Sequence, residues 1–427
     1  MESEAEDTVI GADSAGGSSA ASAADAMPGR RRIVALLALS TLRAMSAWFS
    51  TNAVRPALSA DRGYTSGELT WMAVAIPAGF AAGTLIVAFL NLPDIFRAQK
   101  VYFVGAVGAS LSTISLIPIE AVGVVIATQF SLGLFLAAVY PVGMKLLAGW
   151  YRRGRGLVLG IMIGALTLGS GLPHLFRSLF AEAWEPTIIG AALATLGGGF
   201  LTLVFVPDGP FTAPTTRFRP RYALEVIRGR ATALAIGGYL GHMWELNAMW
   251  TWVPLFLVEV VGNQGLFSGT FELAGVLAFA VFAAGAGGSV LAGLGSERWG
   301  RSLSASAAMI GSGAIALFVG FLPEGASVII VILVLFWGLA VVADSAQFST
   351  AMSELADPSY VGTALTLQTG LGFLLTIGSI RLLPIVQEAQ GWGLAFAMLA
   401  IGPALGTLAM LRLRQLPEAV RMSSGNR

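Results

Sequence analysis

Long runs of apolar residues, separated by short polar or charged links, fill the chain from residue 33 to residue 413. A run of about 20 apolar residues forms a helix long enough to cross a lipid bilayer. The pattern predicts twelve membrane-spanning helices, with one longer polar link after the sixth. The predicted spans are 33–58, 68–91, 100–118, 121–148, 155–180, 185–206, 232–258, 269–294, 302–322, 326–348, 360–383 and 392–413.

The composition favours a membrane protein over a soluble one. Apolar residues make up 56% of the 427 residues and charged residues only 11%, whereas about 25% of the residues of soluble domains are charged. A transmembrane barrel would instead show short segments of alternating polarity. We therefore predict an all-α polytopic membrane protein embedded in a lipid bilayer.

The residue inventory argues against catalysis, cofactors and nucleic acid. The chain has no cysteine, only two histidines and no HExxH motif, so we expect neither a metal site nor another cofactor. The formal net charge of +1 implies no polyanionic partner such as a nucleic acid. Neither a nucleophile–base pair nor a GxxxxGK[ST] motif is present, so we expect no enzyme and no ATP hydrolysis.

Polar segments divide the chain into parts. Residues 1–29 are acidic and then rich in Ala, Ser and Gly, which predicts a disordered cytoplasmic N-terminus rather than a signal peptide. The polar link 207–231 is predicted to be a cytoplasmic loop between a six-helix half at 30–206 and a second one at 232–413. Residues 414–427 form a short cytoplasmic tail.

The basic residues predict the orientation in the membrane. With the N-terminus placed inside, 20 of the 25 Lys and Arg residues fall at the cytoplasmic ends of the predicted spans. Positive charge accumulates on the cytoplasmic side of membrane proteins. We therefore predict a multi-pass protein of the plasma (inner) membrane with both termini in the cytoplasm.

The two halves of the chain repeat one another. NAVRPAL at 52–58 matches WTWVPLF at 250–256, with the prolines aligned, and Asp94 after the second span corresponds to Glu297 after the eighth. Matching features about 200 residues apart indicate duplicated halves related by pseudo-symmetry.

These features resemble the major facilitator superfamily over residues 30–415. The loop signature of that family is roughly G-x-x-x-D-R-x-G-R/K, and the second half matches it with Glu in place of Asp. The first-half copy retains only Asp94, Arg97 and Lys100. The residues that match in the second half are Gly293, Glu297, Arg298, Gly300 and Arg301.

Two further segments bear on the resemblance. The glycine-rich run 156–173 is similar to the fifth helix of the family, whereas residues 129–133 read QFSLG where the family often carries an arginine. The resemblance implies the fold of that superfamily and secondary transport by alternating access. Within it, the chain is similar to bacterial anion porters of the cyanate and nitrate–nitrite kind.

The seventh predicted span carries unusual polarity between Tyr239 and Phe256. Ionisable groups inside a membrane span are costly and usually face a protein interior or a water-filled cavity. On a helix, residues three and four apart share a face. We therefore expect a stripe of this helix to form the wall of a transport cavity, made of Gly238, His242, Glu245, Met249 and Trp252.

Arg43 and Glu245 lie at similar depths on equivalent helices of the two halves. Arg43 either binds an anionic substrate, because its planar guanidinium suits an oxyanion, or pairs structurally with Glu245 or another helix end. Glu245 either carries a coupling proton or binds substrate, or it is the fixed counter-ion of Arg43. His242 could share the proton of Glu245 or only bond a neighbour.

Further candidates lie elsewhere in the spans. Trp48 and Trp244 either line the binding site or pack in the core. Asp344, one turn before Gln347, is an inner gate, a proton group or a satisfied polar contact. Gln368 belongs to a polar cluster for which hydrogen bonding to its own helix is the alternative to substrate binding.

A group of charged residues near the loop signatures is expected to form a cytoplasmic latch that opens and closes during transport. The residues of this predicted latch are Asp94, Arg97, Glu297, Arg298 and Arg301.

The sequence thus predicts a monomeric secondary transporter that moves a small, anionic solute and is coupled to H+. The alternative within transport is proton-driven efflux of multiple drugs or other hydrophobic compounds, which the aromatic residues favour. An alternative of another class is a transporter-fold sensor that does not transport.

Overall fold

The computed structural model describes residues 29–151, 155–180, 183–212, 219–262 and 270–426, and every regular element in these ranges is a helix. The prediction that residues 1–29 are disordered therefore lies almost wholly outside the described residues. The helices are α2 (Arg30–Ala44), η1 (Met45–Ala47), α3 (Ser50–Ala53), α4 (Arg55–Arg62), α5 (Ser66–Leu90), α6 (Leu92–Ile95), α7 (Ala98–Ile114), α8 (Val122–Leu136), α9 (Tyr140–Ala148), α10 (Arg155–Leu179), α11 (Glu185–Phe205), α12 (Pro220–Arg228), α13 (Arg230–Gly262), α14 (Thr270–Trp299), α15 (Arg301–Phe318), η2 (Val319–Phe321), η3 (Glu324–Ala326), α16 (Ser327–Ala343), α17 (Ser345–Leu355), α18 (Val361–Ala397), η4 (Met398–Ala400), α19 (Ile401–Arg414) and η5 (Pro417–Gly425).

Eight helical stretches in the described part of the chain are long and apolar enough to cross a membrane. The longest of them, Val361–Arg414, contains two predicted spans, and Gly391 interrupts it with a left-handed φ of 77°. The chain is therefore a multi-pass helical membrane protein, while the count of twelve spans in two six-helix halves stays a prediction. The eight stretches are Ser66–Leu90, Val122–Ala148, Gly156–Leu179, Glu185–Phe205, Leu273–Ser296, Arg301–Phe321, Ser327–Leu355 and Val361–Arg414.

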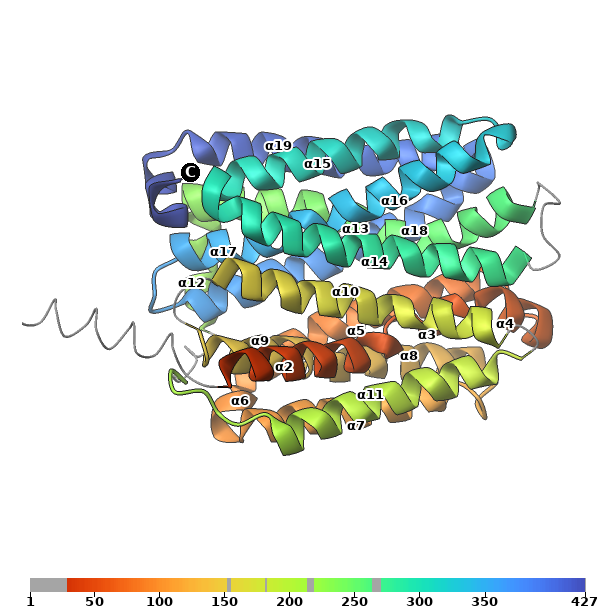
Figure 1. The fold of residues 1–427 in the computed structure, drawn as a ribbon, viewed down its shortest axis with the longest axis horizontal. Coiled ribbons are helices and arrows are strands. Elements are labelled where there is room, and N and C mark those ends of the chain that lie inside the picture. The colour runs from red at the N-terminus through yellow and green to blue at the C-terminus, as the bar shows by residue number, and fades with distance from the viewer. Residues whose placement is uncertain (1–28, 152–154, 181–182, 213–218, 263–269, 427) are drawn as a thin grey trace, which may run out of the picture.

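The helices gather in two groups along one bundle (Figure 1). We call α2 to α11 the N-terminal group and α13 to α19 the C-terminal group. The groups pack together where α10 lies against α14 and where α5 lies against α18. At the first contact, a Cβ on Gly160 would lie 2.8 Å from the main-chain oxygen of Ser289, so the small residue permits the close approach.

The N-terminal group shows how local sequence defines a helix. Thr65 begins α5 with a capping box, in which its hydroxyl accepts from the N–H of Glu68 and the Glu68 carboxylate accepts from the N–H of Thr65. Farther along, α5 crosses α8 at main-chain contact. A Cβ on Gly133 would lie only 1.9 Å from the carbonyl oxygen of Ile76.

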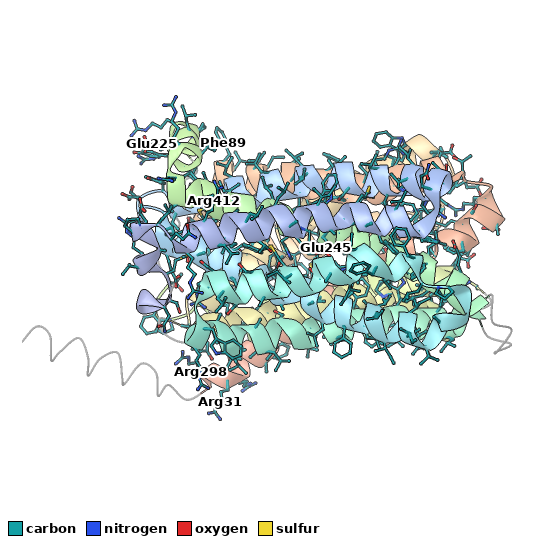
Figure 2. The ribbon with its side chains drawn as sticks, turned by 90° about the horizontal axis from the view of Figure 1, so that it is seen from above. Arg31, Phe89, Glu225, Glu245, Arg298 and Arg412 are labelled. Atoms are coloured by element: carbon teal, nitrogen blue, oxygen red, sulfur yellow. The ribbon has the colours of Figure 1, made fainter. Side chains whose placement is uncertain are left out.

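Several arginines gather at one end of the bundle. Arg31, Arg298 and Arg412 lie at the same end (Figure 2), which is also the end of the C-terminus. We call this the basic end; α4 lies at the opposite end. The grouping agrees with the basic side inferred from the sequence, while the prediction that this side is cytoplasmic stays untested.

The predicted tail at 414–427 is in part folded against the basic end. Within η5, the N–H of Ser423 donates to Glu354 of α17 at 3.1 Å, and its hydroxyl donates to the carbonyl of Ser296 at 3.3 Å. Ala419 and Met422 are fully buried. The tail is thus held to α14 and α17.

Candidate functional site

A cavity of about 110 Å³ lies between the two helix groups. We call it the central cavity. Its described lining includes six aromatic side chains and a set of hydroxyl, amide and imidazole groups, but no Asp, Glu, Lys or Arg. The aromatic residues are Trp48, Phe80, Tyr140, Tyr239, Trp250 and Phe373, and the polar ones are Thr167, Ser170, His242, Asn247, Ser345, Ser349 and Thr369.

Helix α13 presents one face to the central cavity, and it is not the stripe predicted from the sequence. The cavity face has the helical spacing of three and four residues and begins at Tyr239. His242 belongs to both sets, but Glu245 and Trp252 do not line this cavity. Its members are Tyr239, His242, Met243, Leu246, Asn247 and Trp250.

Glu245 lies inside the C-terminal group, near the middle of the bundle (Figure 2). Its side chain is 1% exposed. Oε2 accepts from the hydroxyl of Ser312 on α15 at 2.7 Å, and Oε1 accepts from the indole N–H of Trp337 on α16 at 2.8 Å. The carboxyl group therefore joins three helices of one group, and the expectation that it forms the cavity wall is wrong.

Arg43 is also misplaced by the sequence interpretation. Its side chain is exposed beside α11, where a Cβ on Gly197 would lie 2.5 Å from Nη2. Ser46, one turn later, faces the same helix and donates to the carbonyl of Ala191 at 3.0 Å. The stripe that starts at Arg43 thus packs on α11, so Arg43 neither borders the central cavity nor pairs with Glu245.

The physical reason is the shape of the first predicted span. Helix α2 ends at Ala44 and the chain continues through the 3-10 turn η1, which turns Met45 and Trp48 towards the cavity. A long Arg side chain can lie along a helix surface with its charged end at the edge. Gly197 leaves the space for it.

His242 connects the central cavity to a buried acid. Its Nδ1 lies 2.8 Å from Oδ1 of Asp344, an ion-pair distance, although the contact lacks the alignment of a hydrogen bond. Its Nε2 lies 3.0 Å from the hydroxyl of Ser345, which itself borders the cavity. Asp344 is 2% exposed and stands at the break between α16 and α17. The imidazole therefore contacts both a residue of the cavity wall and a buried acid.

The other predicted site residues are divided between the cavity and the packing of helices. Trp48 borders the cavity and contacts Phe80 and Phe373, with ring centroids 5.1 and 5.6 Å apart. Trp244 points elsewhere and donates to the carbonyl of Met398 at 3.2 Å. Gln368 is 1% exposed, and its side-chain amide has no hydrogen-bond partner among the described residues.

The predicted latch residues are not assembled into one group. Asp94 pairs with Lys145, which joins α6 to α9, while Arg97 is exposed. Arg298 is exposed as well, and the side chain of Glu297 lies outside the described residues.

Arg301 is the latch residue with the most contacts. It is 6% exposed, and its Nη1 donates to Ser296 at 2.8 Å and to Gln347 at 3.4 Å. Its Nη2 lies 3.4 Å from Glu354. Gln347, which the sequence grouped with Asp344, thus belongs to this second cluster, and every described partner of Arg301 lies within the C-terminal group.

Sequence reasoning missed several residues of the site. Tyr239 could have been predicted from the neighbouring stripe of the same helix. Phe80, Tyr140, Phe373 and Ser345 come from four other helices, and nothing in their local sequence marks them. In the described part of the chain, no group of three or more His, Cys, Asp and Glu could hold a metal ion.

Comparison with known proteins adds the family. The family model of the Major Facilitator Superfamily matches residues 36–380. No curated protein matches the chain. The matched segment contains most of the helices that surround the central cavity.

Proposed function

Because the chain belongs to the major facilitator superfamily, whose members are secondary transporters and not enzymes, we propose that it carries a small, uncharged aromatic or apolar solute. The solute would occupy the central cavity and cross by alternating access, driven by coupling to H+. We place the transporter in the plasma membrane as a monomer with both termini in the cytoplasm.

The observation that carries the solute class is the chemistry of the central cavity. Six aromatic side chains surround it, and no formally charged residue belongs to its described lining. A concave, mostly apolar site with a few placed polar groups suits a small organic molecule. Aromatic faces add about 0.5–1.5 kcal/mol per ring pair beyond the area buried. This favours the hydrophobic solute over the anion that the sequence predicted.

Proton coupling is supported by the position of His242. Histidine is the side chain that changes charge near neutral pH, and this one lies between Ser345 at the cavity and Asp344 behind it. A proton held there would lie next to the solute, so binding of the solute and binding of the proton would influence each other. Glu245 lies one turn away on α13, but its carboxyl group accepts hydrogen bonds from Ser312 and Trp337 instead. We therefore assign the proton to the His242–Asp344 pair.

An anionic solute is the second candidate, and one observation favours it. A protonated His242 would supply a positive charge at the cavity wall. The anion would then travel together with the proton. Arg43 supports this candidate no longer, because it lies outside the cavity.

Binding of three compounds that share an indole ring and differ in charge tests the solute class. Indole, indole-3-acetate and tryptamine are neutral, anionic and cationic at neutral pH. A bound compound raises the thermal midpoint of the purified protein through a free energy of RT ln(1 + [L]/Kd). We expect saturable stabilisation by indole above that by either ion. Stabilisation by indole-3-acetate alone would replace the proposal with the anion candidate, and no stabilisation by any of the three would reject both.

Two tryptophans provide a matched pair of variants. Trp48→Leu removes an aromatic wall of the cavity, whereas Trp244→Leu removes a tryptophan that bonds Met398 away from it. We expect the first to weaken indole binding about tenfold, since burial of a ring contributes about 1.5 kcal/mol or more. Trp244→Leu should bind as the wild type does. Equal losses in the two variants would contradict the assignment of the cavity.

Coupling is tested in proteoliposomes with an imposed pH gradient. His242→Gln keeps hydrogen bonding to Ser345 but cannot gain a proton. We expect the variant to retain indole binding and exchange while losing uphill accumulation. Gradient-driven accumulation at the wild-type level would refute the role of His242.

A further inference from the structure

A second cavity lies at the end of the bundle opposite the basic end. It has a volume of about 50 Å³ between the two helix groups, and we call it the outer pocket. Its wall comes from α3, α4 and α10 on one side and from α13 and α14 on the other. Phe49 contacts Phe282 and Trp250, a residue of the central cavity, with ring centroids 5.5 and 5.9 Å apart.

Arg55 gives the outer pocket a buried positive charge. The residue is 8% exposed, and its guanidinium lies 4.3 Å above the ring of Trp252. Nη2 donates to the carbonyl of Ser66 and to the hydroxyl of Thr70, both at 3.1 Å. Nη1 is buried without a hydrogen-bond partner, and no described carboxylate pairs with this arginine. A buried charge of this kind normally has an anionic partner.

Two more buried polar atoms of the same pocket are unpartnered. His174 is 3% exposed, stacks on Phe282 and has no partner at Nε2. Asn52 donates from its amide nitrogen to the carbonyl of Thr251 at 2.9 Å, which leaves its Oδ1 without a partner. Buried polar atoms are almost always hydrogen-bonded in native proteins. Three such atoms around one pocket indicate a site that can bind a polar ligand.

We propose that the outer pocket binds a small hydroxycarboxylate. The planar fork of Arg55 matches a carboxylate, and a charge-assisted pair is the stronger kind of hydrogen bond. The unpartnered Oδ1 of Asn52 needs a donor, which a hydroxyl beside the carboxylate supplies. His174 can donate or accept at Nε2 and so completes the contacts. The site is separate from the solute position in the central cavity and stands whether or not that proposal holds.

Lactate and propionate are probes that differ by one hydroxyl, and propionamide is the uncharged counterpart of propionate. The thermal midpoint of the full chain in detergent is measured against the concentration of each, at constant ionic strength. We expect saturable stabilisation by lactate, binding of propionate that is about threefold to tenfold weaker, and no response to propionamide. The absence of saturable stabilisation by lactate would overturn the proposal, and equal affinity for lactate and propionate would refute the contact with Asn52.

Variants assign the effect to the pocket. Arg55→Gln is expected to weaken the binding of lactate about tenfold or more. Arg55→Lys is expected to restore part of that affinity. The control is Arg381→Gln, because Arg381 stacks over Trp71 and does not line the outer pocket. His174→Gln provides a second variant in case Arg55→Gln does not fold, and it should weaken lactate as well. Wild-type affinity in a folded Arg55→Gln or His174→Gln protein would overturn the proposal.

Discussion

The carboxyl group of Glu245 is predicted to hold three helices of the C-terminal group together. Its two oxygens accept from Ser312 on α15 and from Trp337 on α16. Glu245→Ala would leave both donors buried without an acceptor. Because each unsatisfied donor costs about 1–3 kcal/mol, we expect a loss of about 2–6 kcal/mol in the free energy of unfolding, before any cost of the cavity created.

Glu245→Gln should behave differently, although it removes the same ionisable group. The new amide oxygen can accept from Trp337, and the new amide nitrogen can donate to the oxygen of Ser312. The hydroxyl of Ser312 then donates to the carbonyl of Met309, which already lies 3.3 Å away. Every polar atom keeps a partner, so we expect a change of about 1 kcal/mol or less.

A double-mutant cycle isolates the contact. Ser312→Ala is made in the wild type and in the Glu245→Ala background, and unfolding of the purified protein is measured in mixed micelles with increasing denaturing detergent. Ser312→Ala should lower the free energy of unfolding by about 1–3 kcal/mol less in the Glu245→Ala background than in the wild type. A coupling energy of zero would refute the contact. A Glu245→Gln protein as unstable as Glu245→Ala would refute the exchange of hydrogen bonds.

Two other contacts give tests with internal controls. Gly133→Leu places a side chain against the main chain of α5 and should destabilise the protein by about 3 kcal/mol, whereas Gly123→Leu on the same helix meets no atom within 4 Å; equal unfolding midpoints would contradict the close crossing. Glu354→Ala removes the acceptor of the Ser423 N–H and should speed tryptic cleavage within η5 severalfold, whereas Glu388→Ala, at an exposed carboxylate of α18, should not. Unchanged cleavage of the Glu354 variant would show that this bond does not hold the tail.

The sequence predicted the helical membrane class because the bilayer demands long apolar runs. It could not select the functional face of α13, because that helix is buried on several sides. Trp250 borders the cavity at 5% exposure, while Trp252 faces Arg55 at 2% exposure. When both faces of a helix are buried, the hydrophobic pattern does not show which face borders a cavity. The stripe through Glu245 was therefore as plausible as the one through Tyr239.

The misplacement of Arg43 has a different origin. The rule that charged groups in spans face the protein interior assumed a continuous helix and a side chain that stays at its own depth. The helix instead ends at Ala44, and Arg43 lies along α11 beside Gly197. The pairing of His242 with Asp344 was equally invisible, since it joins helices about 100 residues apart.

The proposed coupling to H+ gives transport through the central cavity an electrical signature. The charges of the protein return to their starting positions in a complete cycle, so under the proposed coupling the net charge that moves is that of the solute plus that of the proton carried with it. A neutral solute carried with one proton moves one elementary charge through the membrane field, and each 100 mV then contributes about 2.3 kcal/mol to the driving force. An anion carried with one proton is electrically silent. The sign and size of the transport current therefore report the charge of the solute directly.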